Sequence, residues 1–223
     1  MITRTGPDFT GFCAGRAAPV PAERAPEGFD TEPSRSDNAS AMAEASEPPV
    51  VKLICGMISS RVELFDAAAE ELSRAFGPID HTSETMDFDF THYYDEQMGT
   101  PLYRRFVGFA EPFQAGSLAD AKLRTNAIEA DFARRRGGGA VRPINLDPGY
   151  VESSKLVLAS MKNFSHRIYL TGGVYAEVTL MVRKGRWVAS PWTFPDFASP
   201  RYHPFLTEVR RRLREQLGKE TRA

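Results

Sequence analysis

Polar side chains that could do chemistry gather in the second half of the sequence. Arg167, Tyr169, Glu177 and Thr179 recur at alternate positions on either side of a Thr171-Gly172-Gly173 loop. An arginine can bind a carboxylate or phosphate through two parallel hydrogen bonds, and a glutamate can orient that arginine or act as a base. These four residues are therefore a candidate polar face for binding an anion.

The register of this hairpin decides which side chains share a face. A two-residue loop would place Leu170 opposite Tyr175 and would mix charged with aliphatic positions. A three-residue loop places Leu170 opposite Val174 and Ile168 opposite Ala176, and gives one continuous apolar face through position 182. Because a slip of one residue exchanges the two faces of a strand, the apolar pattern favours the three-residue loop.

Further residues are candidates for the same site. Asp147 and Lys155 follow the preceding strand and could close a cleft over the polar face, while His166 falls at a strand end on the apolar side. The candidate catalytic residues are Glu177, Asp147 and Lys155, and the candidate ligand-binding residues are Arg167, Tyr169, Thr179 and His166. A solvated sheet face with one ion pair explains the same pattern, and turn formation by Asp147-Pro148-Gly149 explains that tripeptide.

Metal and nucleophile motifs are missing from the sequence. The four histidines have no short metal spacing, and Cys13 and Cys55 lie far apart, so we expect neither a metal site nor a disulfide framework. Asp87 and Asp89 lie two apart on an expected strand and could share Mg²⁺, although a solvent-facing pair explains them as well. Whether the domain uses a cofactor stays open.

The elements that position these residues predict an α+β fold. Strands are expected over 50–58, 79–90, 102–111 and 141–146, with helices over 60–76 and 117–136 after the first and third strands. This β-α-β-β-α-β order is the ferredoxin-like order. An antiparallel meander should follow over 155–160, 166–170, 174–183 and 186–189, and then a C-terminal helix over about 204–217.

Composition and length indicate one domain with a tail. The chain has 223 residues, with 28 Lys and Arg against 29 Asp and Glu. Residues 1–47 hold four arginines and eight carboxylates without periodic apolar positions, which predicts a disordered tail. The single domain should span 48–218, with a short tail over 219–223, and a chain begun at Met42 should keep every element.

Several functional classes are excluded or disfavoured. No apolar run is long enough to span a bilayer, so we expect no membrane association. The small positive charge of the domain hardly supports nucleic-acid binding. We expect a cytoplasmic protein, in which Cys55 stays a thiol.

Several uncommon strings occur in a familiar order. Those of residues 145–150, 154–160, 166–170 and 191–196, after the opening strand, resemble a bacterial domain-of-unknown-function family, the one numbered 4416. The resemblance covers about 48–217. Some members of that family carry a GTP-binding label, but this sequence contains no G-x-x-x-x-G-K-[ST] loop to hold phosphates.

Two hypotheses of function follow. In the first, the domain binds or acts on a small anionic, phosphorylated molecule at the polar face, and whether it is an enzyme stays open. In the alternative, it is a non-catalytic protein-interaction module. Trp192 and Phe194 of the aromatic segment 191–197 would then anchor a protein partner.

Overall fold

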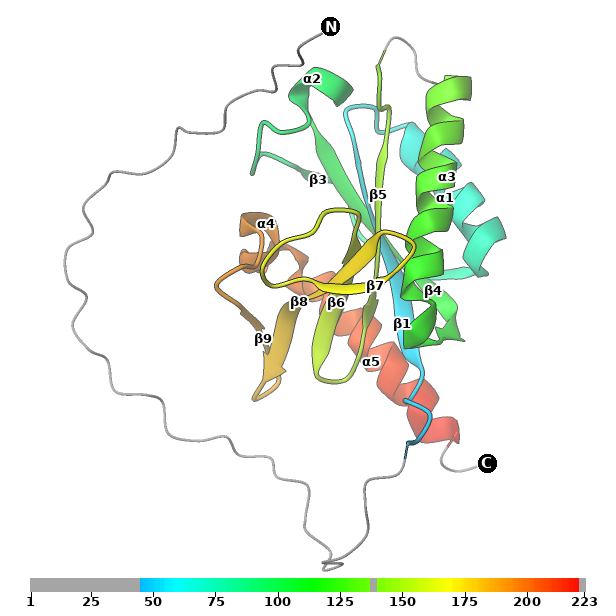
Figure 1. Cartoon of the computed structure of the whole chain (residues 1–223), viewed down its shortest axis with the longest axis vertical. Coiled ribbons are helices and arrows are strands. Elements are labelled where there is room, and N and C mark those ends of the chain that lie inside the picture. The colour runs from blue at the N-terminus through cyan, green and yellow to red at the C-terminus, as the bar shows by residue number, and fades with distance from the viewer. Residues whose placement is uncertain (1–44, 137–139, 221–223) are drawn as a thin grey trace, which may run out of the picture. The chain divides into compact units, whose positions relative to one another are not determined.

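The computed structural model describes residues 45–136 and 140–220 (Figure 1). Every element named below lies within residues 51–220. The tail predicted over 1–47 lies outside the described residues except for its last three positions. No described helix is long and apolar enough to cross a membrane.

The described residues form nine strands and five α-helices. The strands are β1 (Val51–Ser59), β2 (Ile79–Thr82), β3 (Met86–Asp87), β4 (Tyr103–Phe113), β5 (Asn145–Val151), β6 (Lys155–Ser160), β7 (Ile168–Thr171), β8 (Val174–Arg183) and β9 (Arg186–Ala189). The helices are α1 (Leu64–Phe76), α2 (Asp95–Met98), α3 (Leu118–Arg136), α4 (Pro195–Ala198) and α5 (His203–Glu220). Two short 3-10 turns, Ala115–Ser117 and Pro200–Tyr202, precede α3 and α5.

All nine strands join one antiparallel sheet. Its order is β2-β4-β1-β5-β6-β8-β7, with β3 paired to β4 and β9 paired to β8. The α+β class and the C-terminal helix are therefore as the sequence predicts, but the meander predicted over 155–189 is wrong, because β6 pairs with β8 and not with β7. The strand expected over 79–90 is divided into β2 and β3, which pair with β4 separately.

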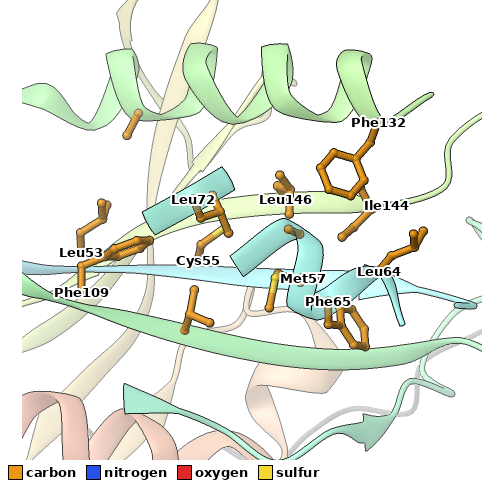
Figure 2. Close-up of a cluster of buried hydrophobic side chains, with 13 residues drawn as sticks. Leu53, Cys55, Met57, Leu64, Phe65, Leu72, Phe109, Phe132, Ile144 and Leu146 are labelled. Atoms are coloured by element: carbon orange, nitrogen blue, oxygen red, sulfur yellow. The ribbon is translucent and has the colours of Figure 1, made fainter. Parts of the chain in front are cut away.

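The central strand β1 is buried along its whole length, as its apolar run predicts. Its alternate residues Leu53, Cys55 and Met57 pack with α1 and α3 (Figure 2). Ile54 points to the other face and belongs to a second buried cluster, which includes Leu206 of α5. Helices thus cover both faces of the sheet, and the apolar area that they remove from water is the main stabilising term.

The turn predicted at Asp147-Pro148-Gly149 is wrong. The tripeptide lies inside β5, where Asp147 pairs with Gly56 and Pro148 with Cys55 of β1. The pairing of β5 with β6 begins only at Gly149. Pro148 therefore lies where β5 has a single hydrogen-bonded neighbour, the kind of position at which a strand tolerates proline.

Replacing Gly149 by alanine should destabilise the fold by about 1–3 kcal/mol, because the sheet leaves no room for a side chain. A Cβ there would lie 2.5 Å from the carbonyl oxygen of Val157 and 2.5 Å from Leu158 Cδ2. Urea denaturation measures the loss. Gly218→Ala is the matched control, since nothing lies within 4 Å of its Cβ and alanine favours the helix. An unchanged midpoint for Gly149→Ala would contradict this packing.

The β7–β8 hairpin combines the two registers considered for it. Its loop is the two-residue Gly172-Gly173, and Thr171 pairs with Val174. An irregularity at Leu170 then restores the predicted pairing of Ile168 with Ala176. The three-residue loop is therefore wrong at the turn, while the register that it predicted further along the strands is confirmed.

A second bulge changes the faces of β8. The pairing with β6 passes from Val157–Val178 to Leu156–Leu180, which leaves Thr179 as an extra residue. Val178 consequently packs toward α3, whereas Leu180 packs with α5 on the opposite face. The continuous apolar face predicted for 174–182 is wrong, because a bulge exchanges inward and outward positions beyond it.

Candidate functional site

A cleft of about 790 Å³ opens over the part of the sheet formed by β5, β6 and β8. Its size is typical of pockets that enclose small-molecule ligands. The described residues that line it include five cations and three carboxylates: Arg104, Lys122, Arg142, Lys162, Arg167, Asp147, Glu177 and Asp196. The wall therefore carries an excess of positive charge, which favours an anionic occupant.

Glu177 on β8 is the centre of a polar cluster at one end of the cleft. Its side chain is buried, and Oε2 accepts a hydrogen bond from Arg167 Nε at 2.7 Å. His166 Nε2 lies 2.9 Å from the same oxygen, and the Thr179 hydroxyl is 3.4 Å from Oε1. The predicted pair of Arg167 and Glu177 is thus present, with His166 as a third member.

The carboxylate of Glu177 acts here as an orienting group. It holds one edge of the His166 ring and the Nε edge of the Arg167 guanidinium. Arg167 Nη1 donates to the Lys162 carbonyl at 2.9 Å, so the guanidinium is held from two sides. A histidine held by a carboxylate is the arrangement that enzymes use to fix a general base, with its second ring nitrogen left for the reacting group.

Asp147 lies at the other end of the cleft on β5. Asn145 Nδ2 donates to its Oδ2 at 2.6 Å, and Lys122 Nζ lies 3.4 Å from Oδ1. Burial raises the pKa of Asp147, but the charges of Lys122 and Arg104 and the hydrogen bond from Asn145 outweigh it, so the pKa is lowered overall. Asp147 is therefore a carboxylate at neutral pH and is poorly suited to donate a proton.

Arg142 and Glu129 support this end of the cleft. Arg142 Nη2 donates to Glu129 Oε2 at 2.7 Å and also to Asn145 Oδ1, while Glu129 Oε1 accepts from the Leu146 amide at 2.7 Å. Burial raises the pKa of Glu129 even though Lys122 and Arg142 oppose it. The chain of contacts fixes Asn145, which in turn fixes Asp147.

Arg104 on β4 lies at the floor of the cleft with unused hydrogen-bonding capacity. Its side chain is 4% exposed, and neither Nε nor Nη1 has a partner. Nη2 lies 3.7 Å from Asp196 Oδ2 and 3.9 Å from Asp147 Oδ2. Four aromatic rings surround its guanidinium carbon at 5.0–5.7 Å: Phe88, Phe106, Phe197 and Tyr202. Unpaired buried donors are costly, and Nη1 faces the sheet, where a Cβ on Gly56 would lie 3.1 Å from it.

Replacing Asp147 by asparagine should produce a pH-dependent loss of stability, about 1.5–3 kcal/mol at pH 7. The folded-state pKa of Asp147 is lowered, so its contribution is fully present above the unfolded pKa, near 4, and is lost as pH falls through the folded value. Urea midpoints at pH 7, 5 and 3 should therefore show wild type and variant converging at low pH. Glu84→Gln, at an exposed carboxylate, is the control. A gap that stays constant to pH 3 would contradict the assignment.

The structure brings together only part of the predicted site. His166, Arg167, Glu177 and Asp147 line the cleft, while Thr179 is buried behind it against Glu177. Lys155 forms an ion pair with Glu152 beyond the cleft. Tyr169 is exposed on β7 and packs edge-on against Tyr175. Neither Lys155 nor Tyr169 lines the cleft, so the geometry gives neither of them a part in it.

The sequence reasoning missed Arg104, Lys122 and Asp196. Each is charged and buried in the structure. The available signals were weak: Arg104 alternates with buried Phe106 on a predicted strand, and Lys122 follows Ala121 on the apolar side of a predicted helix. Charged residues at such inward positions need partners.

The aromatic segment 191–197 folds back onto the sheet and forms a wall of the cleft. Trp192 Nε1 donates to the Val178 carbonyl at 3.0 Å, and Thr193 Oγ1 donates to the Thr179 carbonyl at 2.6 Å. Both carbonyls lie at the bulge in β8. The bulge therefore supplies the acceptors that fix this wall.

Asp87 and Asp89 both contact Arg201. The Asp87 carbonyl and the Asp89 carboxylate both accept from Arg201 Nη1, at 2.7 and 3.0 Å. Within 45–136 and 140–220 there is no group of three His, Cys, Asp or Glu side chains placed to hold a metal ion.

Comparison with known proteins identifies a family for this chain. No curated protein and no solved structure matches it. A family model described as a domain of unknown function, DUF4416, matches residues 49–213. That span includes the whole sheet and every residue of the cleft named above. The chain therefore belongs to the DUF4416 family.

Proposed function

We propose that the cleft binds a small anionic molecule, and that a phosphorylated one fits it best. The observation that carries the proposal is the charge of the cleft wall, in which the five cations, the buried guanidinium of Arg104 among them, outnumber the three carboxylates. Arg167 and Lys162 in the lining supply further positive charge. Phosphate oxygens accept several hydrogen bonds at once, and arginine is well shaped to donate them.

We also propose which residues would act if the ligand undergoes a reaction. His166 would move the proton, because Glu177 already holds one edge of its ring. Glu177 would orient His166 and Arg167, and the carboxylate of Asp147 would position the cations Lys122 and Arg104. The sequence left Glu177 either to orient Arg167 or to act as a base; its burial and its three partners favour the orienting role.

A thermal-shift panel tests the binding proposal. Inorganic phosphate, ribose 5-phosphate and nucleoside monophosphates should raise the melting temperature of the wild-type protein, while uncharged ribose should not. Arg167→Gln should lose the response. Arg186→Gln, at an exposed arginine on β9 outside the cleft, should keep it. Silence across the panel would remove the proposal.

The first half of the domain fits a ferredoxin-like unit, which we propose as its ancestry. Support comes from the sheet order β2-β4-β1-β5 and from the helices α1 and α3, which follow β1 and β4. In this view β6 to β9 extend one edge of that unit. The cleft lies where the extension meets it, on β5 and β6.

A further inference from the structure

Large aromatic side chains are exposed around the mouth of the cleft. Tyr93, Phe164, Trp192 and Phe194 are 56%, 64%, 43% and 47% exposed, and all four line the cleft. Scattered apolar residues on a surface need no explanation, but several rings gathered at one concavity mark a binding surface. The mouth therefore offers aromatic faces that residues 45–136 and 140–220 leave exposed.

Trp192 and the neighbouring imidazole of His166 form a platform that is already fixed. The Trp192 indole stacks on the His166 imidazole, with centroids 5.6 Å apart and planes 12° apart. The indole is held by its hydrogen bond to the Val178 carbonyl, and the imidazole by Glu177. Phe164 meets the imidazole edge-on, at 5.3 Å and 62°. A ligand ring that stacks here would lose little side-chain entropy from the protein.

Cationic groups lie directly beside these rings. Lys162 Nζ is 4.1 Å from the centroid of the Tyr93 ring and 2.6 Å from its hydroxyl. The Arg167 guanidinium carbon is 5.8 Å from the centroid of Phe194. Aromatic rings and cations therefore lie next to one another in the lining of the cleft.

Resting on the proposed function, we infer that the ligand carries a planar aromatic ring joined to its anionic group. The ring stacks at the Trp192–His166 platform, and the anion reaches toward Arg167 and Arg104. An aliphatic anion such as a sugar phosphate would bind the cations but would leave the aromatic rings exposed to solvent. Stacking on an aromatic side chain adds about 1–3 kcal/mol, which corresponds to roughly 5- to 150-fold in affinity.

Matched pairs of probes test the inference by calorimetry on the wild-type protein. Phenyl phosphate is compared with inorganic phosphate, and adenosine monophosphate with ribose 5-phosphate. The aromatic member of at least one pair should bind about 10-fold more tightly or better. If phenyl phosphate binds more tightly than inorganic phosphate, an aromatic ring alone is sufficient for the gain in affinity. If only adenosine monophosphate binds more tightly than its partner, the site recognises a nucleoside. Both outcomes support the inference.

Fluorescence locates the ring. The chain has two tryptophans, and Trp187 lies away from the cleft, where its Nε1 bonds Thr207 at 3.1 Å. In Trp187→Phe, Trp192 is the sole reporter and should be quenched by the aromatic probe but not by its partner. Trp192→Leu should reduce the affinity ratio to near one.

The outcomes separate this inference from the proposed function. Equal affinity within both pairs would overturn the inference that the ligand carries an aromatic ring, and would leave the proposal of anion binding intact. A tighter aromatic probe whose ratio survives Trp192→Leu would overturn the platform as its site. Failure of every probe to bind would overturn both proposals.

Discussion

Glu177→Ala should lower the free energy of unfolding by about 3–5 kcal/mol, because it removes one partner of a buried ion pair. The side chains of Glu177 and Arg167 are 2% and 8% exposed. Without the carboxylate, the Arg167 guanidinium keeps the Lys162 carbonyl as an acceptor but loses its counter-charge. His166 loses its partner as well. Equilibrium urea denaturation, with the slope checked for two-state behaviour, measures the loss.

Controls separate the loss of charge from the loss of volume. Glu177→Gln keeps the shape and one acceptor, so it should cost less than alanine. Glu152→Ala removes a carboxylate of an exposed pair with Lys155 and should stay close to wild type. Arg167→Met with Glu177→Leu removes both charges and should recover part of the stability. A loss below about 1 kcal/mol for Glu177→Ala would mean that water reaches the pair, as it does in a solvated sheet face.

The parts of the fold that the sequence predicts well are those with strong local periodicity. The uniform apolar run gave β1 to within a residue, and the stripe of Leu206, Val209 and Leu213 identified α5, which begins one residue earlier than expected. In both elements the apolar positions that predicted the strand or helix are the positions that are buried in the structure. Local pattern and tertiary burial agree there, which is the condition under which sequence reasoning works.

Prediction failed where a partner distant in sequence decides the conformation. Asp147-Pro148-Gly149 has the composition of a turn, but pairing with β1 keeps it extended. No residue pattern in the sequence indicates the bulges at Leu170 and Thr179. Register and faces depend on such irregularities.

Mainly the part of the candidate site that lies within one hairpin was predicted, because most of the other residues are brought in from elements distant in sequence. Arg167 and Glu177 pair across one hairpin, and sequence spacing can find such pairs. Arg104 comes from β4 and Asp196 from α4, and they meet at the cleft floor only through the tertiary fold. A charged residue is assigned to solvent by default, so buried cations are the residues that sequence reasoning misses most easily.

Phe106→Ala should also cost about 3–5 kcal/mol, because this ring joins β4 to the C-terminal elements. Phe106 is fully buried, and its ring centroid lies 5.9, 4.8 and 5.3 Å from those of Phe197, Tyr202 and Phe205. Truncation leaves a cavity among these rings and removes one of the four that surround Arg104. The loss is measured by urea denaturation, with near-ultraviolet circular dichroism to follow aromatic packing.

Two variants test the interpretation of that loss. Phe106→Leu fills more of the cavity and should cost less than alanine. Phe194→Ala removes a ring that is 47% exposed at the mouth of the cleft and should change stability little. Phe106→Ala should also weaken the binding of inorganic phosphate, because Arg104 is then less firmly held, whereas Phe194→Ala should leave it intact. A Phe106→Ala protein as stable as Phe194→Ala would show that α5 and α4 are held to the sheet without this ring.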